Sequence, residues 1–108
     1  MTNPQLVGFA LDTGHALHAG KDPAALIGVL GKRLGVIHFA DYSDQGSSGP
    51  GRPPLGEGRL NIPAAVAALR KVDFDQWIVL EEQTVSATGR PMAERGLAVL
   101  RTAFRPAK

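Results

Sequence analysis

Three side chains that can bind a divalent metal ion recur at comparable points of the sequence: Asp12, His38 and Glu81. Each lies at or near the C-terminal end of a short apolar run. Two carboxylates and an imidazole form an oxygen and nitrogen ligand set that suits Mn²⁺, Mg²⁺, Co²⁺ or Zn²⁺. An ion held by them could polarise a carbonyl or hydroxyl group. The sequence predicts a metal site if the three runs meet in space.

Each of these residues also has an ordinary structural interpretation. An Asp after a strand often caps a helix or forms a turn, a His in an apolar run is often a core residue, and a Glu at a strand end can face water. The shared position in three successive units favours one common site over three separate explanations. Glu82 replaces Glu81 if the strand end shifts by one residue. His18 could join His15, but we expect it in a solvated loop.

The elements that must position these residues follow from the apolar pattern. Strands are expected at Leu6–Leu11, Gly35–Ala40 and Trp77–Leu80, and their near-continuous apolar character is typical of strands buried on both faces. Helical spacing after each strand predicts helices from about Pro23 to Leu34, Pro63 to Val72 and Pro91 to Phe104. Asp22 is the expected cap of the first helix, and Asn61 or Ile62 lies near the cap of the second.

Strands that alternate with helices predict an α/β fold with parallel strands. The C-terminal ends of parallel strands share one edge of the sheet, so the three candidate ligands can converge there. The segment Ser43–Arg59 is rich in glycine and proline and predicts a long loop after the second strand. Such loops often carry function, although a domain linker is the alternative.

Composition narrows the class of protein. The 108 residues allow one small domain, and 44% hydrophobic and 20% charged residues are typical of a folded chain. The absence of cysteine excludes disulfides and thiolate metal sites, and a net charge of +2 does not favour nucleic-acid binding. No apolar run is long enough to span a membrane and no signal peptide is evident, so we expect a cytoplasmic protein. Phosphate-loop, nucleophile-elbow and dinucleotide-binding motifs are also missing.

Four motifs occur in a recognisable order: Phe9–His15 (FALDTGH), Val36–Asp41 (VIHFAD), Leu55–Gly58 (LGEG) and Trp77–Glu81 (WIVLE). Together they resemble the C-terminal part of the xylose isomerase-like TIM-barrel superfamily. The nearest group is the sugar phosphate isomerase/epimerase branch, which includes inosose dehydratase, hydroxypyruvate isomerase and ketose 3-epimerases. The resemblance implies that residues 1–108 form a partial domain, equivalent to the last three βα units of a (β/α)₈ barrel.

The resemblance also implies roles for the matching residues. Asp12, His38 and Glu81 correspond to metal ligands, and His15 corresponds to a substrate-binding group. Glu81 would also be one of two catalytic carboxylates that move a proton at a carbon next to a carbonyl, while the metal ion stabilises the developing charge. Glu57 lies in a loop that shapes the substrate site, with a solvated loop charge as the alternative.

Two family features have no counterpart in the sequence. The remaining metal-binding Glu, which is also the second catalytic carboxylate, belongs to an earlier strand. A substrate-clamping Arg soon after the metal-binding His is not evident, although Arg52 or Arg59 could replace it. Apurinic-site endonucleases of the same superfamily are a less favoured alternative, because they carry an additional His in the segment that here reads Gly51–Leu55.

A complete barrel needs eight strands and about 250 residues. Three parallel strands leave two open edges and a partly uncovered inner face. We therefore expect self-association or a missing N-terminal half-barrel as the partner, together with a small-molecule sugar substrate. The resemblance implies a metal-dependent sugar isomerase, epimerase or dehydratase. A non-catalytic half-barrel or assembly module is the alternative.

Overall fold

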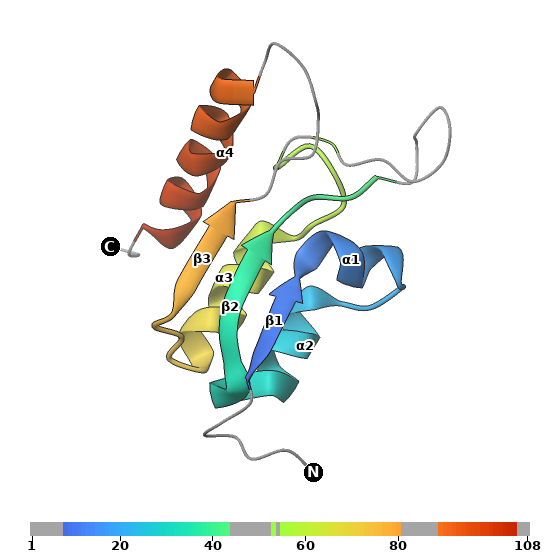
Figure 1. Cartoon of the computed structure of the whole chain (residues 1–108), viewed down its shortest axis with the longest axis vertical. Coiled ribbons are helices and arrows are strands. Elements are labelled where there is room, and N and C mark those ends of the chain that lie inside the picture. Colours follow the sequence, from blue (N-terminus) through green and yellow to red (C-terminus); the bar gives the residue numbers. More distant parts are fainter. Residues whose placement is uncertain (1–7, 44–52, 54, 81–88, 106–108) are drawn as a thin grey trace.

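The three strands that the structure describes form one parallel sheet in the order β1-β2-β3 (Figure 1). The computed structural model describes residues 8–43, 53, 55–80 and 89–105, with only the backbone described for 89–93. The strands are β1 (Phe9–Asp12), β2 (Leu34–Phe39) and β3 (Trp77–Leu80). Both strand pairs are parallel, as predicted from the alternation of strands and helices.

Helices follow each strand. They are α1 (Thr13–His18), α2 (Pro23–Leu30), α3 (Ile62–Lys71) and α4 (Gly89–Phe104), and a 3₁₀ turn (Gly31–Arg33) connects α2 to β2. The predicted caps are confirmed where the side chains accept backbone hydrogen bonds, at Asp22 for α2 and at Asn61 for α3. Ile62, the alternative cap of α3, is instead its first helical residue.

The structure corrects three details of the predicted elements. The helix expected to reach Leu34 ends at Leu30, because Gly31 takes a positive φ of 53° and the chain turns into β2. The short helix α1 was not expected. It contains His18, so the prediction that His18 lies in a loop is wrong: its ring packs edge-on against Tyr42, with centroids 5.4 Å apart.

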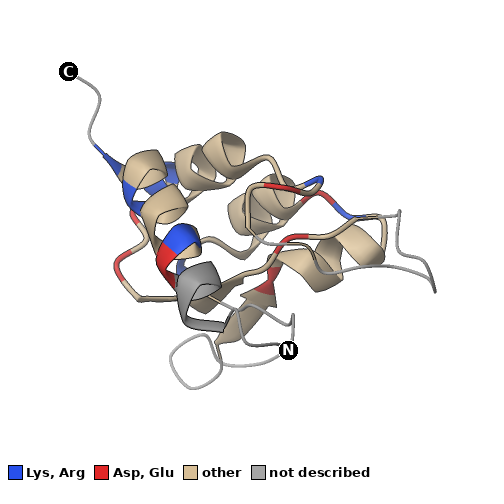
Figure 2. Ribbon diagram, turned by 90° about the horizontal axis from the view of Figure 1, so that it is seen from above, with Lys and Arg blue, Asp and Glu red and all other residues tan. Residues whose placement is uncertain are grey.

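Among the residues that the structure describes, the helices cover one face of the sheet and leave the other open. Leu11, Ile37 and Phe39 are buried against the helices, and Phe39 meets Phe104 of α4 edge-on. Figure 2 shows the helices gathered on one side of the strands. On the other face Trp77 is 78% exposed and Val79 36% exposed. The expectation of strands buried on both faces is therefore wrong for the described part of the chain, in which no element covers the second face.

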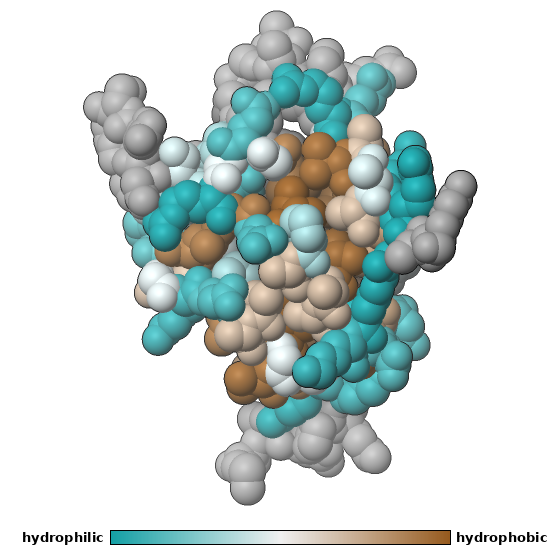
Figure 3. All heavy atoms as spheres, turned by 180° about the vertical axis from the view of Figure 1, so that it is seen from behind, coloured by the Kyte–Doolittle hydropathy of each residue, from teal (hydrophilic) through white to brown (hydrophobic). Residues whose placement is uncertain are grey.

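The core lies between the sheet and helices α2, α3 and α4. Ile27 of α2 and Val66 and Leu69 of α3 are almost fully buried, and Leu100 contributes from α4. Figure 3 views this helix side of the molecule and shows apolar residues in the middle with hydrophilic residues around them. Packing on this side holds the strands in register, which fixes the relative positions of their C-terminal ends.

In the part of the chain that the structure describes, no helix combines the length and apolar character needed to span a membrane.

Candidate functional site

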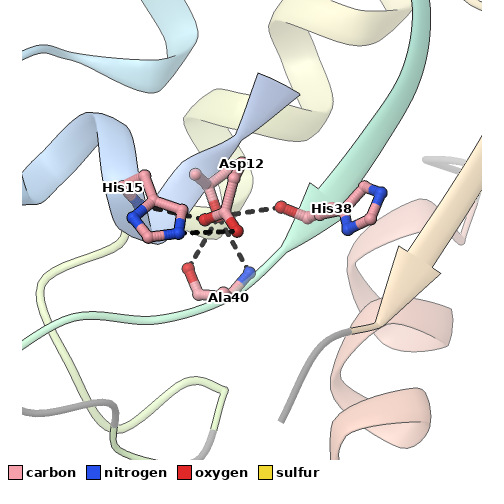
Figure 4. Close-up of polar contacts among 5 residues, drawn as sticks. Asp12, His15, His38 and Ala40 are labelled. Atoms are coloured by element: carbon pink, nitrogen blue, oxygen red, sulfur yellow. Dashed lines mark hydrogen bonds and ion pairs between the residues drawn. The ribbon is translucent and has the colours of Figure 1, made fainter. Parts of the chain in front are cut away.

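Two of the three predicted ligands are neighbours at the ends of β1 and β2. Asp12 and His38 are register partners, so their side chains project from the same face of the sheet. The Asp12 side chain is 18% exposed and His38 is half-buried, so both are accessible from solvent. Figure 4 shows the two strand ends with their polar contacts. The parallel sheet therefore places Asp12 and His38 side by side at neighbouring strand ends, and their role as metal ligands stays a prediction.

Asp12 also contacts His15, the predicted substrate-binding residue. Its Oδ1 atom accepts the backbone N–H of His15 at 2.9 Å, which makes Asp12 the N-cap of α1. Its Oδ2 atom lies 3.8 Å from His15 Nε2 (Figure 4). Capping and metal binding were alternatives in the sequence, but a carboxylate has enough lone pairs for both. The cap orients the carboxylate and brings the His15 imidazole beside it.

The third predicted ligand, Glu81, and its alternative Glu82 lie outside the described residues. Across the described ranges, no group of three or more His, Asp or Glu side chains could hold a metal ion. The structure thus brings together two candidate ligands and a neighbouring imidazole, and Glu81 stays a prediction.

A buried hydroxyl joins the two strand ends. Thr13, directly after Asp12, is fully buried. Its Oγ1 atom accepts the Ala40 N–H at 2.9 Å and donates to the Ala40 carbonyl at 2.6 Å (Figure 4). The Thr13 hydroxyl therefore makes the hydrogen bonds with Ala40 that a backbone partner would make if the β-ladder continued. These bonds keep the end of β1 beside the end of β2.

Asp41, which follows Ala40, is a buried carboxylate that the sequence pattern did not indicate as a site residue. Asp41 accepts hydrogen bonds from the backbone of the loop Leu55–Leu60. Its signal in the sequence was an Asp one residue beyond a strand, together with the two glycines of LGEG. That signal does not reveal the partners, because the hydrogen bonds span up to 19 residues.

Glu57, the other predicted substrate-binding residue, lies in this loop. Its Oε2 atom is 2.6 Å from Arg95 Nη2 of α4, and both side chains are more than half exposed. The ion pair connects the loop to α4. Arg59, one candidate for the missing substrate-clamping Arg, is exposed in the same loop, whereas Arg52 lies outside the described residues.

Three parallel βα units with Asp12 and His38 at neighbouring strand ends are the arrangement of part of an α/β barrel, and comparison with known proteins identifies the family. The model of the xylose isomerase-like TIM barrel family matches residues 1–103, so the chain belongs to that family. The inosose dehydratase of Geobacillus kaustophilus (strain HTA426) is 28% identical, over 84% of this chain and 34% of the relative.

Solved structures show the same fold. An L-ribulose 3-epimerase matches 90% of this chain and 36% of its own, with 17% identity and a TM-score of 0.73. The IOLI protein with a bound zinc atom matches 91% of this chain and 37% of its own, with 20% identity and a TM-score of 0.70. The chain spans about a third of the length of the relatives that it matches. It forms a part of the barrel, as the motifs predicted.

Proposed function

We propose that this chain contributes part of the active site of a metal-dependent sugar isomerase, epimerase or dehydratase. The observation that carries the proposal is the register pairing of Asp12 with His38 at the C-terminal ends of parallel strands. In barrel enzymes this edge carries the active site. The family match and the named activities of the relatives, an inosose dehydratase and an L-ribulose 3-epimerase, support a sugar-derived substrate with a carbonyl group.

The residues fit a divalent metal ion. Asp12 supplies carboxylate oxygen and His38 supplies imidazole nitrogen, from adjacent strands and one face. Glu81 follows Leu80, the last residue of β3, and lies two positions after Val79, the register partner of His38. We assign Glu81 as the third ligand from this spacing. The bound ion would stabilise negative charge that develops on the substrate oxygen.

The chain's own residues would perform the proton transfer. In this proposal Glu81 is the general base that accepts a proton from the carbon next to the substrate carbonyl. His15, held beside Asp12, donates a hydrogen bond to a substrate hydroxyl. A second carboxylate and the remaining substrate contacts would come from further βα units, since the chain spans only about a third of its relatives.

The same units would cover the open face of the sheet. This face carries Asp12 and His38 beside the apolar side chains of Val36 and Val79 and near Trp77. In a closed barrel, side chains in these positions fill the interior. Covering them would exclude water around the metal ligands, which strengthens the electrostatic interactions there.

A Mn²⁺ titration of the chain, followed by the loss of the free-ion signal in electron paramagnetic resonance, tests the site. We expect Asp12→Asn and His38→Ala each to weaken binding by at least about tenfold. Asn is as good an N-cap as Asp, so Asp12→Asn removes the anionic ligand and keeps the start of α1.

His18→Ala and Asp75→Asn are the matched controls, because they remove an imidazole and a carboxylate that are exposed and outside the proposed ligand set. We expect both to bind Mn²⁺ like the unmodified chain. Equal Mn²⁺ affinity in all four variants would contradict the site, and a folded chain that binds no Mn²⁺ would favour the non-catalytic assembly module.

A further inference from the structure

Asp41 is the only buried acidic residue in the described part of the chain, with 2% of its surface exposed. Its Oδ1 atom accepts the backbone N–H groups of Tyr42 at 2.8 Å and Leu60 at 2.9 Å. Its Oδ2 atom accepts those of Gly56 at 2.9 Å and Gly58 at 3.0 Å. Four donors on two oxygens match an ionised carboxylate, which only accepts hydrogen bonds.

The contact with the Asp41 carboxylate explains why the loop has glycine at positions 56 and 58. Gly56 has a φ of 96°, a conformation that side chains with a Cβ rarely adopt. A Cβ atom at Gly58 would collide with the Asp41 carboxylate and the Tyr42 carbonyl. The loop backbone can therefore approach Asp41 only because both positions are glycine, so the motif Leu55–Gly58 is built around a carboxylate of the chain itself.

Short-range contacts connect Asp41 to the proposed metal ligands. Ala40 precedes Asp41 and exchanges two hydrogen bonds with the buried Thr13 hydroxyl. Thr13 in turn follows Asp12, and its hydroxyl lies 3.4 Å from the His38 carbonyl oxygen. The loop, the end of β2 and the end of β1 thus form one hydrogen-bonded unit, and Asp41 is the residue that joins the loop to it.

We propose that Asp41 is a positioning residue of the metal site, an inference that rests on the proposed function. Its carboxylate holds the loop Leu55–Leu60 at the end of β2 and, through Ala40 and Thr13, fixes Asp12 relative to His38. Asp41 touches neither the metal ion nor the substrate in this role. A change at Asp41 should therefore alter the geometry of two residues that it does not contact.

Asp41→Asn tests the proposal, with Asp75→Asn as the matched control for the lost charge. The Asn side chain would turn an NH₂ group toward donors, so two of the four hydrogen bonds fail. We expect amide hydrogen exchange at Gly56, Gly58 and Leu60 to accelerate by at least about tenfold, with Ile37 of β2 unchanged. Mn²⁺ affinity should fall by about tenfold in Asp41→Asn and stay constant in Asp75→Asn.

A second pair of variants approaches the same contact from the loop. Gly58→Ala introduces a methyl group against the Asp41 carboxylate, whereas Gly28→Ala introduces one on the exposed side of α2, with no atom within 4 Å. We expect Gly58→Ala to reproduce the effects of Asp41→Asn on amide exchange and Mn²⁺ affinity. Gly28→Ala should change neither.

The readouts separate this proposal from the proposed function. Faster amide exchange with unchanged Mn²⁺ affinity would overturn the positioning role, and so would unchanged exchange in Asp41→Asn. If the unmodified chain binds no Mn²⁺, the proposed function fails, and the NMR resonances of the His15 and His38 rings become the readout. A shift of both rings in Asp41→Asn but not in Asp75→Asn then supports the positioning role, and unshifted rings overturn it.

Discussion

At the scale of single residues, the buried hydroxyl of Thr13 replaces a backbone hydrogen-bond partner at the end of a strand. Its hydroxyl satisfies both the N–H and the carbonyl group of Ala40 in a position where the ladder between β1 and β2 has ended. Buried backbone groups without partners are costly, so this hydroxyl stabilises the corner that carries Asp12 and His38.

We expect Thr13→Val to lower the free energy of unfolding by about 1–3 kcal/mol, because it preserves the shape of the side chain but leaves two buried backbone groups without a partner. Thr13→Ser keeps the hydroxyl and should cost less. Urea denaturation monitored by circular dichroism measures both. Thr102→Val, at an exposed position of α4, is the control. If the Val and Ser variants lose equal stability, the hydroxyl is not the stabilising group.

At the scale of secondary-structure elements, local signals in the sequence predicted strands and helix caps well. Contacts between residues far apart in the sequence could not be predicted from it. The strand Trp77–Leu80 was predicted with its observed bounds, and the caps Asp22 and Asn61 follow from side-chain chemistry within three residues. The short helix α1 carries too few residues for an apolar period to be visible.

The same division applies to the candidate site. The pairing of Asp12 with His38 could be predicted because each lies near the end of its strand and parallel strands align their ends. The partners of Asp41 could not, since its hydrogen bonds reach the loop Leu55–Leu60 far along the chain. The ion pair between Glu57 and Arg95 was hidden for the same reason, as it joins residues 38 positions apart.

The cap of α2 gives a prediction at this scale. Asp22 accepts the Ala24 N–H at 3.2 Å, and Pro23 occupies the first turn. We expect Asp22→Ala to destabilise the chain by about 0.5–2 kcal/mol, since it leaves an N–H group at the helix start without its side-chain partner. Asp22→Asn retains the acceptor oxygen and should stay near the unmodified stability in thermal or urea unfolding. Equal losses in both variants would show that charge, rather than capping geometry, stabilises α2.

At the scale of the whole molecule, the described helices cover one face of the sheet, and no described element covers the other. The helices bury Leu11, Ile37 and Phe39 on one side, while Trp77 and Val79 remain exposed on the other. The relatives that the chain matches are about three times as long, and their additional length is sufficient for the further βα units of a closed barrel. An apolar sheet face with open strand edges favours association when those units are absent.

We therefore expect the chain on its own to pair with a second copy through this face. Light scattering coupled to size exclusion should give a mass above that of the monomer, increasing with concentration. Val79→Lys places a charge on the open face of β3 and should shift the mass toward the monomer, because a buried unpaired ammonium group is costly. Val29→Lys is the matched control: Val29 is 82% exposed on α2, away from the sheet, so the same substitution there should leave the association unchanged. A stable, folded monomer at every concentration, or an equal response to both Lys variants, would show that the open face does not bind a second copy.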